Sequence, residues 1–333
     1  MNKQVKGINS LRFLAFLMVY TAHLFPGFKF GLNGVPIFFT ISSFLISYLA
    51  ILEINQTGNF SRGNFFIRRA LRIYPVYYLV LLLAFLVLPL LSGIFNFPLS
   101  LPAEKWKFWI FLSNYENSSY VFFLRLLWSV SIEEQFYIGF ILLSFAFKRY
   151  PYQLFTILTL IYLVYFSIKP GTLVSNPYFN TLTHLPNFIS GMLIAKIYVT
   201  RRESLKPMLW VYASLLLIFG TYTYTTGQGI RYHLLTIAFG SSCVIICILL
   251  LQTFLSKWTN RCYHWMENAG NYTYGLYMYS GIAITINIGF LDIKNPLLAA
   301  IVVTIILIIL TAISYRFMEL PLLRLKSRFR QKE

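Results

Sequence analysis

The sequence predicts an all-α polytopic membrane protein: a bundle of about ten transmembrane helices with both termini in the cytoplasm. Three observations support this fold class. Of the 333 residues, 58% are hydrophobic and only 11% are charged, whereas soluble proteins average about 25% charged residues. Apolar runs of roughly 20 residues, the length that crosses a bilayer, recur along the whole chain. Finally, Lys and Arg gather in alternate breaks between these runs.

The apolar runs, separated by charged or Pro/Gly/Asn-rich breaks, predict ten spans in a single domain covering 1–333. They occupy 8–25, 34–54, 73–95, 128–147, 152–168, 181–199, 208–225, 232–254, 269–290 and 296–318. We expect helices because lipid cannot satisfy an open backbone, and a barrel would show short alternating segments instead. Within the long interruption 96–127, the segment Trp106–Trp109 predicts a short helix at the membrane surface.

The formal net charge of +18 has two interpretations, nucleic-acid binding or membrane topology, and its distribution favours topology. If the N-terminus is cytoplasmic, 18 basic residues fall inside: Lys3, Lys6, Arg62, Arg68, Arg69, Arg72, Lys148, Arg149, Arg201, Arg202, Lys206, Lys257, Arg261, Arg324, Lys326, Arg328, Arg330 and Lys332. Seven fall outside: Lys29, Lys105, Lys107, Arg125, Lys169, Arg231 and Lys294. We therefore expect a basic cytoplasmic tail at 319–333 that contacts lipid headgroups, and no nucleic-acid partner.

Ionisable residues inside spans are costly, about 2.5–3.5 kcal/mol each, and therefore indicate function. Arg12 and His23 are 11 residues apart on the first predicted helix, which returns them to nearly the same face with a rise of about 16 Å. Glu133 and Glu134 lie in the fourth span at a depth similar to that of His23. Because adjacent residues point about 100° apart, only one of them is expected to meet the imidazole. A carboxylate that orients a histidine is typical of general-base catalysis; the alternative is a charge pair that locks two helices together.

A basic cluster at Arg68–Pro75 stands at the predicted mouth of the third span. Arg69 and Arg72 share a helix face, and two guanidiniums suit phosphate oxygens. The alternative, that they only follow the positive-inside rule and contact lipid phosphate, is equally supported by composition.

Other polar residues favour structural roles. We interpret His184 and His233 as hydrogen-bonding groups near span ends, although they could line an acceptor path, and His264 as solvated. Arg316 and Glu319 are three residues apart and predict an ion pair that locks the last span. No metal-ligand spacing, phosphate-binding loop or nucleophile elbow is present in the sequence, so no metal is expected. We expect packing and interface contacts from three tyrosines: Tyr74, Tyr77 and Tyr78.

Several motifs together resemble the acyltransferase-3 family of integral-membrane acyltransferases, which O-acylate envelope and surface glycans. The resemblance spans positions 7–328 and begins with Arg12 and His23, which match the family's R-x10-H pattern. The remaining motifs are Gly34-Val35-Pro36-Ile37-Phe38-Phe39-Thr40-Ile41-Ser42-Ser43-Phe44-Leu45-Ile46, Arg69-Ala70-Leu71-Arg72-Ile73-Tyr74-Pro75, Trp128-Ser129-Val130-Ser131-Ile132-Glu133-Glu134-Gln135-Phe136-Tyr137, Thr273-Tyr274-Gly275-Leu276-Tyr277 and Ser314-Tyr315-Arg316-Phe317-Met318-Glu319-Leu320-Pro321.

The resemblance implies a multi-pass protein of the bacterial cytoplasmic membrane. Such a protein moves an acetyl or other short acyl group from cytoplasmic acyl-CoA to a hydroxyl of a surface polysaccharide, such as O-antigen or exopolysaccharide. It implies a catalytic role for His23, either as general base or as acyl carrier, with Glu133 or Glu134 in support. It implies acyl-CoA binding by three arginines: Arg12, Arg69 and Arg72.

The sequence departs from the family pattern in three respects. Ser43 replaces a usual glycine, and we expect a change in helix packing rather than in chemistry. Many relatives carry a histidine after the Leu276–Tyr277 segment, where this chain has Met278, Tyr279 and Ser280. Since only 15 residues follow the last predicted span, we expect no fused SGNH-type esterase domain. Two alternative functions stay open: a glycan or lipid-linked sugar exporter without acyl transfer, and an acyltransferase for a small molecule.

Overall fold

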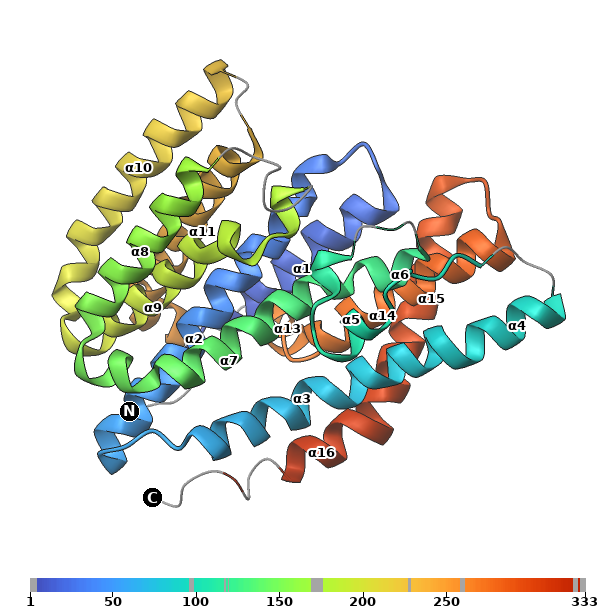
Figure 1. Cartoon of the computed structure of the whole chain (residues 1–333), viewed down its shortest axis with the longest axis horizontal. Coiled ribbons are helices and arrows are strands. Elements are labelled where there is room, and N and C mark those ends of the chain that lie inside the picture. Colours follow the sequence, from blue (N-terminus) through green and yellow to red (C-terminus); the bar gives the residue numbers. More distant parts are fainter. Residues whose placement is uncertain are drawn as a thin grey trace. The chain divides into compact units, whose positions relative to one another are not determined.

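The computed structural model describes residues 5–95, 99–116, 118, 120–168, 176–226, 229–257, 261–325 and 329. Throughout these ranges the regular secondary structure is helical, which confirms the predicted all-α class (Figure 1). Lys3, Lys169, Trp258 and positions 326–328 and 330–333 of the predicted basic tail lie outside the described residues.

Seven helical segments of the described chain are long and apolar enough to cross a membrane: 30–57, 62–94, 122–149, 202–226, 230–250, 273–291 and 296–325. Each overlaps one predicted span. The other three predicted spans fall on α1 (Ile8–Leu24), α8 (Pro151–Ser167) and α9 (Leu185–Thr200), which have 17, 17 and 16 residues. Ten spans and cytoplasmic termini therefore stay predictions.

The third span begins earlier than predicted. The helix α3 (Arg62–Leu82) starts 11 residues before the predicted start at 73, and continues through a π-turn (Leu83–Val87) into α4 (Leu88–Phe95). Charged and polar residues in the first turns hide this part of the helix from an apolar search. The arginine cluster consequently lies within a continuous helix that also contains Pro75.

The chain forms two compact units. The first comprises Met1–Val19, Phe30–Phe60 and Gln135–Asn271. In it, α2 (Gly34–Thr57) packs against α9 and α11 (Ile230–Leu250), α10 (Leu205–Thr226) packs against α11, and α8 packs against α9. The unit also includes α13 (Arg261–Ala269) and the 135–149 part of α7 (Leu127–Arg149).

Small and polar residues hold the first unit together. The Asn187 side-chain amide donates to the Pro36 carbonyl and to the Thr40 hydroxyl, both at 3.0 Å. The Thr40 hydroxyl also lies 2.9 Å from that of Ser241. In an apolar medium such hydrogen bonds and close helix contacts replace the hydrophobic effect as the cause of helix association. They join α2, α9 and α11.

An acidic residue anchors the start of α1 in the first unit. The Glu267 carboxylate on α13 accepts hydrogen bonds from the Gly7 backbone N–H and from the Ser10 hydroxyl. A carboxylate at a helix N-terminus satisfies free N–H groups and complements the helix dipole. Since α1 carries Arg12 and His23, this contact fixes the beginning of the helix that bears them.

The second unit comprises Tyr20–Lys29, Ser61–Glu134 and Tyr272–Glu333. Its centre is α14 (Thr273–Ile286), which packs against α15 (Pro296–Ser314), α6 (Phe122–Arg125) and α3. A π-turn (Tyr315–Glu319) joins α15 to α16 (Leu320–Leu325). The π-turn and α16 each contact α3. The short helix predicted at Trp106–Trp109 is confirmed as α5, and its position at the membrane surface stays a prediction.

Candidate active site

The buried acid of the predicted site is Glu134. Its side chain on α7 is 2% exposed, whereas Glu133 beside it is half-buried. The Tyr74 hydroxyl donates to Oε2 of Glu134 at 3.3 Å. The other oxygen, Oε1, is buried without a hydrogen-bond partner among the residues described. A buried acceptor left unsatisfied costs free energy, so Oε1 is a candidate contact point for a proton donor.

Charged neighbours act on the Glu134 carboxylate from two sides. The charges that act on it belong to Glu133, beside it on α7, and to Arg69 on α3, and they are of opposite sign. The Arg69 guanidinium also lies 5.6 Å from the centre of the Phe65 ring. Arg69 therefore connects the basic cluster of α3 to the buried acid, a link that sequence spacing does not reveal.

Arg72, one turn further along α3, acts electrostatically on a different acid, Glu319. Glu319 is 7% exposed and accepts from the Ser314 hydroxyl at 3.4 Å. The Tyr279 hydroxyl in turn donates to Ser314 at 2.8 Å. The two arginines predicted to bind acyl-CoA thus act electrostatically on different buried carboxylates.

The predicted Arg316–Glu319 ion pair is wrong. Arg316 is exposed, and its guanidinium lies 6.0 Å from the centre of the Phe317 ring instead. The physical reason is the π-turn at Tyr315–Glu319, whose wider turn brings residues five apart into register. Glu319 consequently meets Ser314, five positions earlier, rather than Arg316.

His23 lies in the second unit, as do the two glutamates and the two arginines of α3. Its half-buried imidazole packs edge-on against Phe122, with ring centres 5.2 Å apart. Phe122 begins α6, directly before α7. The pairing of His23 with Glu133 or Glu134 stays a prediction, and so does the role of Arg12, which is half-buried on α1 among residues of the first unit.

Between α4 and α6, the described residues 99–116, 118, 120 and 121 lie against α3, and we call them the 99–121 loop. The Tyr77 hydroxyl donates to the Phe108 carbonyl at 2.7 Å, and the Tyr78 hydroxyl donates to the Trp109 carbonyl at 3.1 Å. The Ser113 and Ser131 hydroxyls, 2.7 Å apart, tie the loop to α7. These contacts agree with the predicted packing role of Tyr77 and Tyr78.

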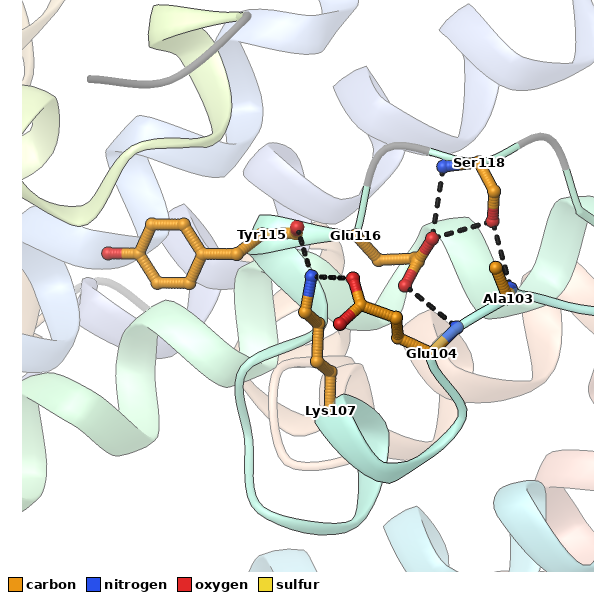
Figure 2. A network of polar contacts seen from close by, with 6 residues as sticks. All are labelled: Ala103, Glu104, Lys107, Tyr115, Glu116 and Ser118. Carbon is orange, nitrogen blue, oxygen red and sulfur yellow. Dashed lines mark hydrogen bonds and ion pairs between the residues drawn. The ribbon is translucent and has the colours of Figure 1, made fainter.

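One ion pair and several hydrogen bonds link the residues of this loop to one another (Figure 2). Lys107 pairs with Glu104 and donates to the Tyr115 carbonyl at 2.8 Å. The Glu116 carboxylate accepts from the backbone N–H of Glu104 at 3.2 Å and from both the N–H and the hydroxyl of Ser118, at 3.0 and 2.6 Å. Burial alone would raise the pKa of Glu116, but these donors and the Lys107 charge together lower it.

The remaining histidines of the spans have hydrogen-bonding roles. His184 is fully buried, with Nε2 2.8 Å from the Tyr178 carbonyl oxygen and its ring against Phe39. Nε2 of His233 lies 3.0 Å from Oδ1 of Asn33. Both observations agree with the structural interpretation rather than with an acceptor path.

The sequence did not predict the partners of two residues, Tyr74 and Glu319. Tyr74 was expected to pack and instead donates to Glu134, and Glu319 was expected to pair within its own helix. Spacing gave no signal for Tyr74, because a residue two positions after Arg72 points to a different face of α3 from the arginines. For Glu319 the sequence contains no signal, because its pairing with Ser314 depends on the π-turn, which the sequence does not predict.

Comparison with known proteins identifies the family. A model of an acyltransferase domain, acyltransferase-3, matches residues 5–316. Peptidoglycan O-acetyltransferase OatA of Listeria monocytogenes is 28% identical, over 96% of this chain and 56% of its own. The putative peptidoglycan O-acetyltransferase YrhL of Bacillus subtilis is 26% identical, over 96% of this chain and 55% of its own.

A putative O-acetyltransferase of Staphylococcus aureus is 29% identical over 59% of this chain and 35% of its own. The chain thus spans about half the length of the curated relatives that match most of it. No solved structure matches it. Because the domain model covers nearly the whole chain, as the motifs indicated, the chain belongs to the acyltransferase-3 family.

Proposed function

We propose that the chain is a membrane O-acetyltransferase that moves an acetyl group from acetyl-CoA to a hydroxyl of an envelope glycan. The observation that carries the proposal is Glu134, a buried acid held by Tyr74 at one oxygen and without a described partner at the other. Such an oxygen suits a general-base system, in which a carboxylate orients an imidazole and stabilises its protonated form.

Each residue has a defined part in the proposed reaction. Arg69 and Arg72 bind the phosphates of the donor through paired N–H groups, with Arg12 as a further cation. His23 takes the proton of the glycan hydroxyl as its oxygen attacks the thioester carbonyl. The carbon–sulfur bond then breaks, the acetyl ester forms, and the coenzyme A thiolate takes up the proton. In a second version His23 itself carries the acetyl group between donor and acceptor.

Peptidoglycan is the glycan that we favour, because two relatives that match 96% of this chain are named for its O-acetylation. The multi-pass character, supported by seven sufficiently long apolar helices, fits an enzyme of the bacterial cytoplasmic membrane. Its acyl-CoA donor would reach it from the cytoplasm.

The experiment that tests this function compares His23→Ala with His264→Ala in cells. His264 is an exposed histidine on α13 and serves as the matched control. We expect His23→Ala cells to make and export glycan at normal yield but without the acetyl ester signal in NMR, while His264→Ala cells keep both. Loss of the glycan itself, with normal ester content on what remains, would favour the alternative of an exporter.

A further inference from the structure

Three tyrosines of α3 each donate a hydrogen bond through the phenolic hydroxyl. Tyr77 and Tyr78 donate to backbone carbonyls of the 99–121 loop, at 2.7 and 3.1 Å. Tyr74 alone of the three donates to a carboxylate, that of Glu134. The same helix therefore holds the loop with two hydroxyls and the buried acid with the third.

The ring of Tyr74 is fixed by the loop that its neighbours hold. Phe111 packs on it with ring centres 5.2 Å apart, and also packs on Tyr77 at 4.5 Å. Phe111 is 6% exposed and has a φ of +58°, a backbone conformation uncommon for a bulky residue. Such a conformation persists where surrounding contacts over-determine it.

Such contacts lie before and after Phe111 in the chain. The Phe111 N–H itself donates to the Phe108 carbonyl at 3.5 Å. The Leu112 N–H donates to the Lys107 carbonyl at 2.7 Å, and Ser113 bonds Ser131 on α7. The Phe66 ring also packs edge-on against Tyr74, with ring centres 6.0 Å apart. Tyr74 therefore has little freedom to move its hydroxyl away from Glu134.

From this geometry we infer that Tyr74 is a positioning residue, which holds Oε2 of Glu134 so that Oε1 faces the reacting group. The inference rests on the proposed function. A carboxylate bound at one oxygen cannot rotate freely, so its second oxygen keeps one direction. Outer groups of this kind commonly orient the residue that performs the chemistry and are needed for full activity.

The test measures acetyl transfer from labelled acetyl-CoA by purified wild-type and variant protein in proteoliposomes. Tyr74→Phe keeps the ring and its packing on Phe111 but removes the hydroxyl. We expect kcat to fall about tenfold or more while KM for acetyl-CoA changes less than about twofold. Tyr78→Phe, the matched control, removes one of the two hydroxyl ties to the loop and leaves the shorter one, from Tyr77 at 2.7 Å, in place. It should therefore stay near wild type in both constants.

A second variant separates positioning through Glu134 from a general packing effect. Glu134→Asp withdraws the carboxylate from the Tyr74 hydroxyl by one methylene. Adding Tyr74→Phe to Glu134→Asp should therefore lower kcat by less than about twofold. Thermal unfolding of each variant shows whether it is folded. The kcat values of the two single variants and the double variant are compared only where all three are folded.

Three results would overturn the inference: an unchanged kcat in Tyr74→Phe, an equal loss in Tyr78→Phe, or a further tenfold loss in the Glu134→Asp background. Failure of the proposed function looks different, because wild-type protein itself would then transfer no label. If Tyr74→Phe does not fold, Phe111→Leu replaces it as the test, because it loosens the packing of the Tyr74 ring and keeps the hydroxyl. Phe111→Leu should lower kcat with little change in KM. An unchanged kcat in this variant would also overturn the inference.

Discussion

Ser43 on α2 and Gly191 on α9 are in direct contact. A β-carbon built on Gly191 would lie 1.9 Å from the Ser43 hydroxyl oxygen and 2.5 Å from the Thr40 carbonyl oxygen. The serine that replaces the family's usual glycine is thus accommodated by a glycine on the facing helix. This places Ser43 in helix packing, as the sequence suggested.

Gly191→Ala should therefore destabilise the first unit. The serine hydroxyl can rotate away, but the Thr40 carbonyl and the Phe44 N–H, 2.8 Å from the new carbon, belong to the backbone. We expect a loss of about 1–3 kcal/mol, the usual cost of overpacking. Thermal unfolding in detergent measures it.

Gly139→Ala on α7 is the matched control, since a β-carbon there meets nothing within 4 Å. Helix propensity predicts no loss, or a gain of up to about 1 kcal/mol. Equal stability of the two variants would show that α2 and α9 are not as close as described.

The two arginines of α3 should respond differently to substitution by lysine, which keeps the charge but not the paired donors. Arg72→Lys should raise KM for acetyl-CoA about tenfold with kcat nearly unchanged. Arg69→Lys should raise KM and also lower kcat, because Arg69 acts on Glu134. Steady-state kinetics in proteoliposomes separates the two constants.

Arg68→Lys is the control for both arginine variants. Its guanidinium donates to the Phe329 carbonyl at 2.8 Å, so it serves a backbone contact. Near-normal kinetics are expected. Identical behaviour of all three lysine variants would mean that the cluster acts only through its net charge, as the positive-inside rule requires.

The 99–121 loop should loosen in acid. The pKa of Glu116 is lowered in the folded loop, so its contribution to stability is fully present above its unfolded pKa of about 4.3 and is lost as pH falls through the lower folded value. Hydrogen exchange of residues 100–116, corrected for the intrinsic rate, should show steady protection from about pH 5 to 8 and less protection below about pH 4.

Glu116→Gln supplies the comparison for the loop. The neutral amide is a weaker acceptor for the Glu104 and Ser118 donors, so protection should be lower throughout and should no longer depend on pH in this range. A wild-type loop whose protection is flat down to pH 3 would contradict the role given to the Glu116 carboxylate.

The periodicity of apolar residues and the cost of burying charge were sufficient to predict the helical class and to select the pair Glu133 and Glu134, but not to tell which of the two is buried. An acid in an apolar run must be buried and must have a purpose, wherever its partners lie. They could not reveal that Tyr74, 60 residues away in sequence, donates to that acid, because this depends on how α3 and α7 pack. The same limit applies to Phe111, whose positive φ is set by tertiary contacts in a loop with no strong local pattern.

The sequence also did not predict where α3 begins or how residues pair near the π-turn at Tyr315–Glu319. An apolar search begins α3 at 73, because nothing in the composition of 62–72 shows that its charged residues continue a helix. Spacing of three residues predicts a pair only in a regular α-helix, so the π-turn at Tyr315–Glu319 invalidated the Arg316–Glu319 prediction.

The central claim of the proposed function is that the protein transfers acetyl groups and that this transfer requires His23 and Glu134. The direct measurement is the rate at which labelled acetyl-CoA, supplied to vesicles with the cytoplasmic face exposed, labels an added glycan acceptor. Wild-type protein should transfer the label, and His23→Ala and Glu134→Gln should each be slower by about 100-fold or more. Wild-type rates in both variants, or no labelled ester with wild-type protein, would contradict it.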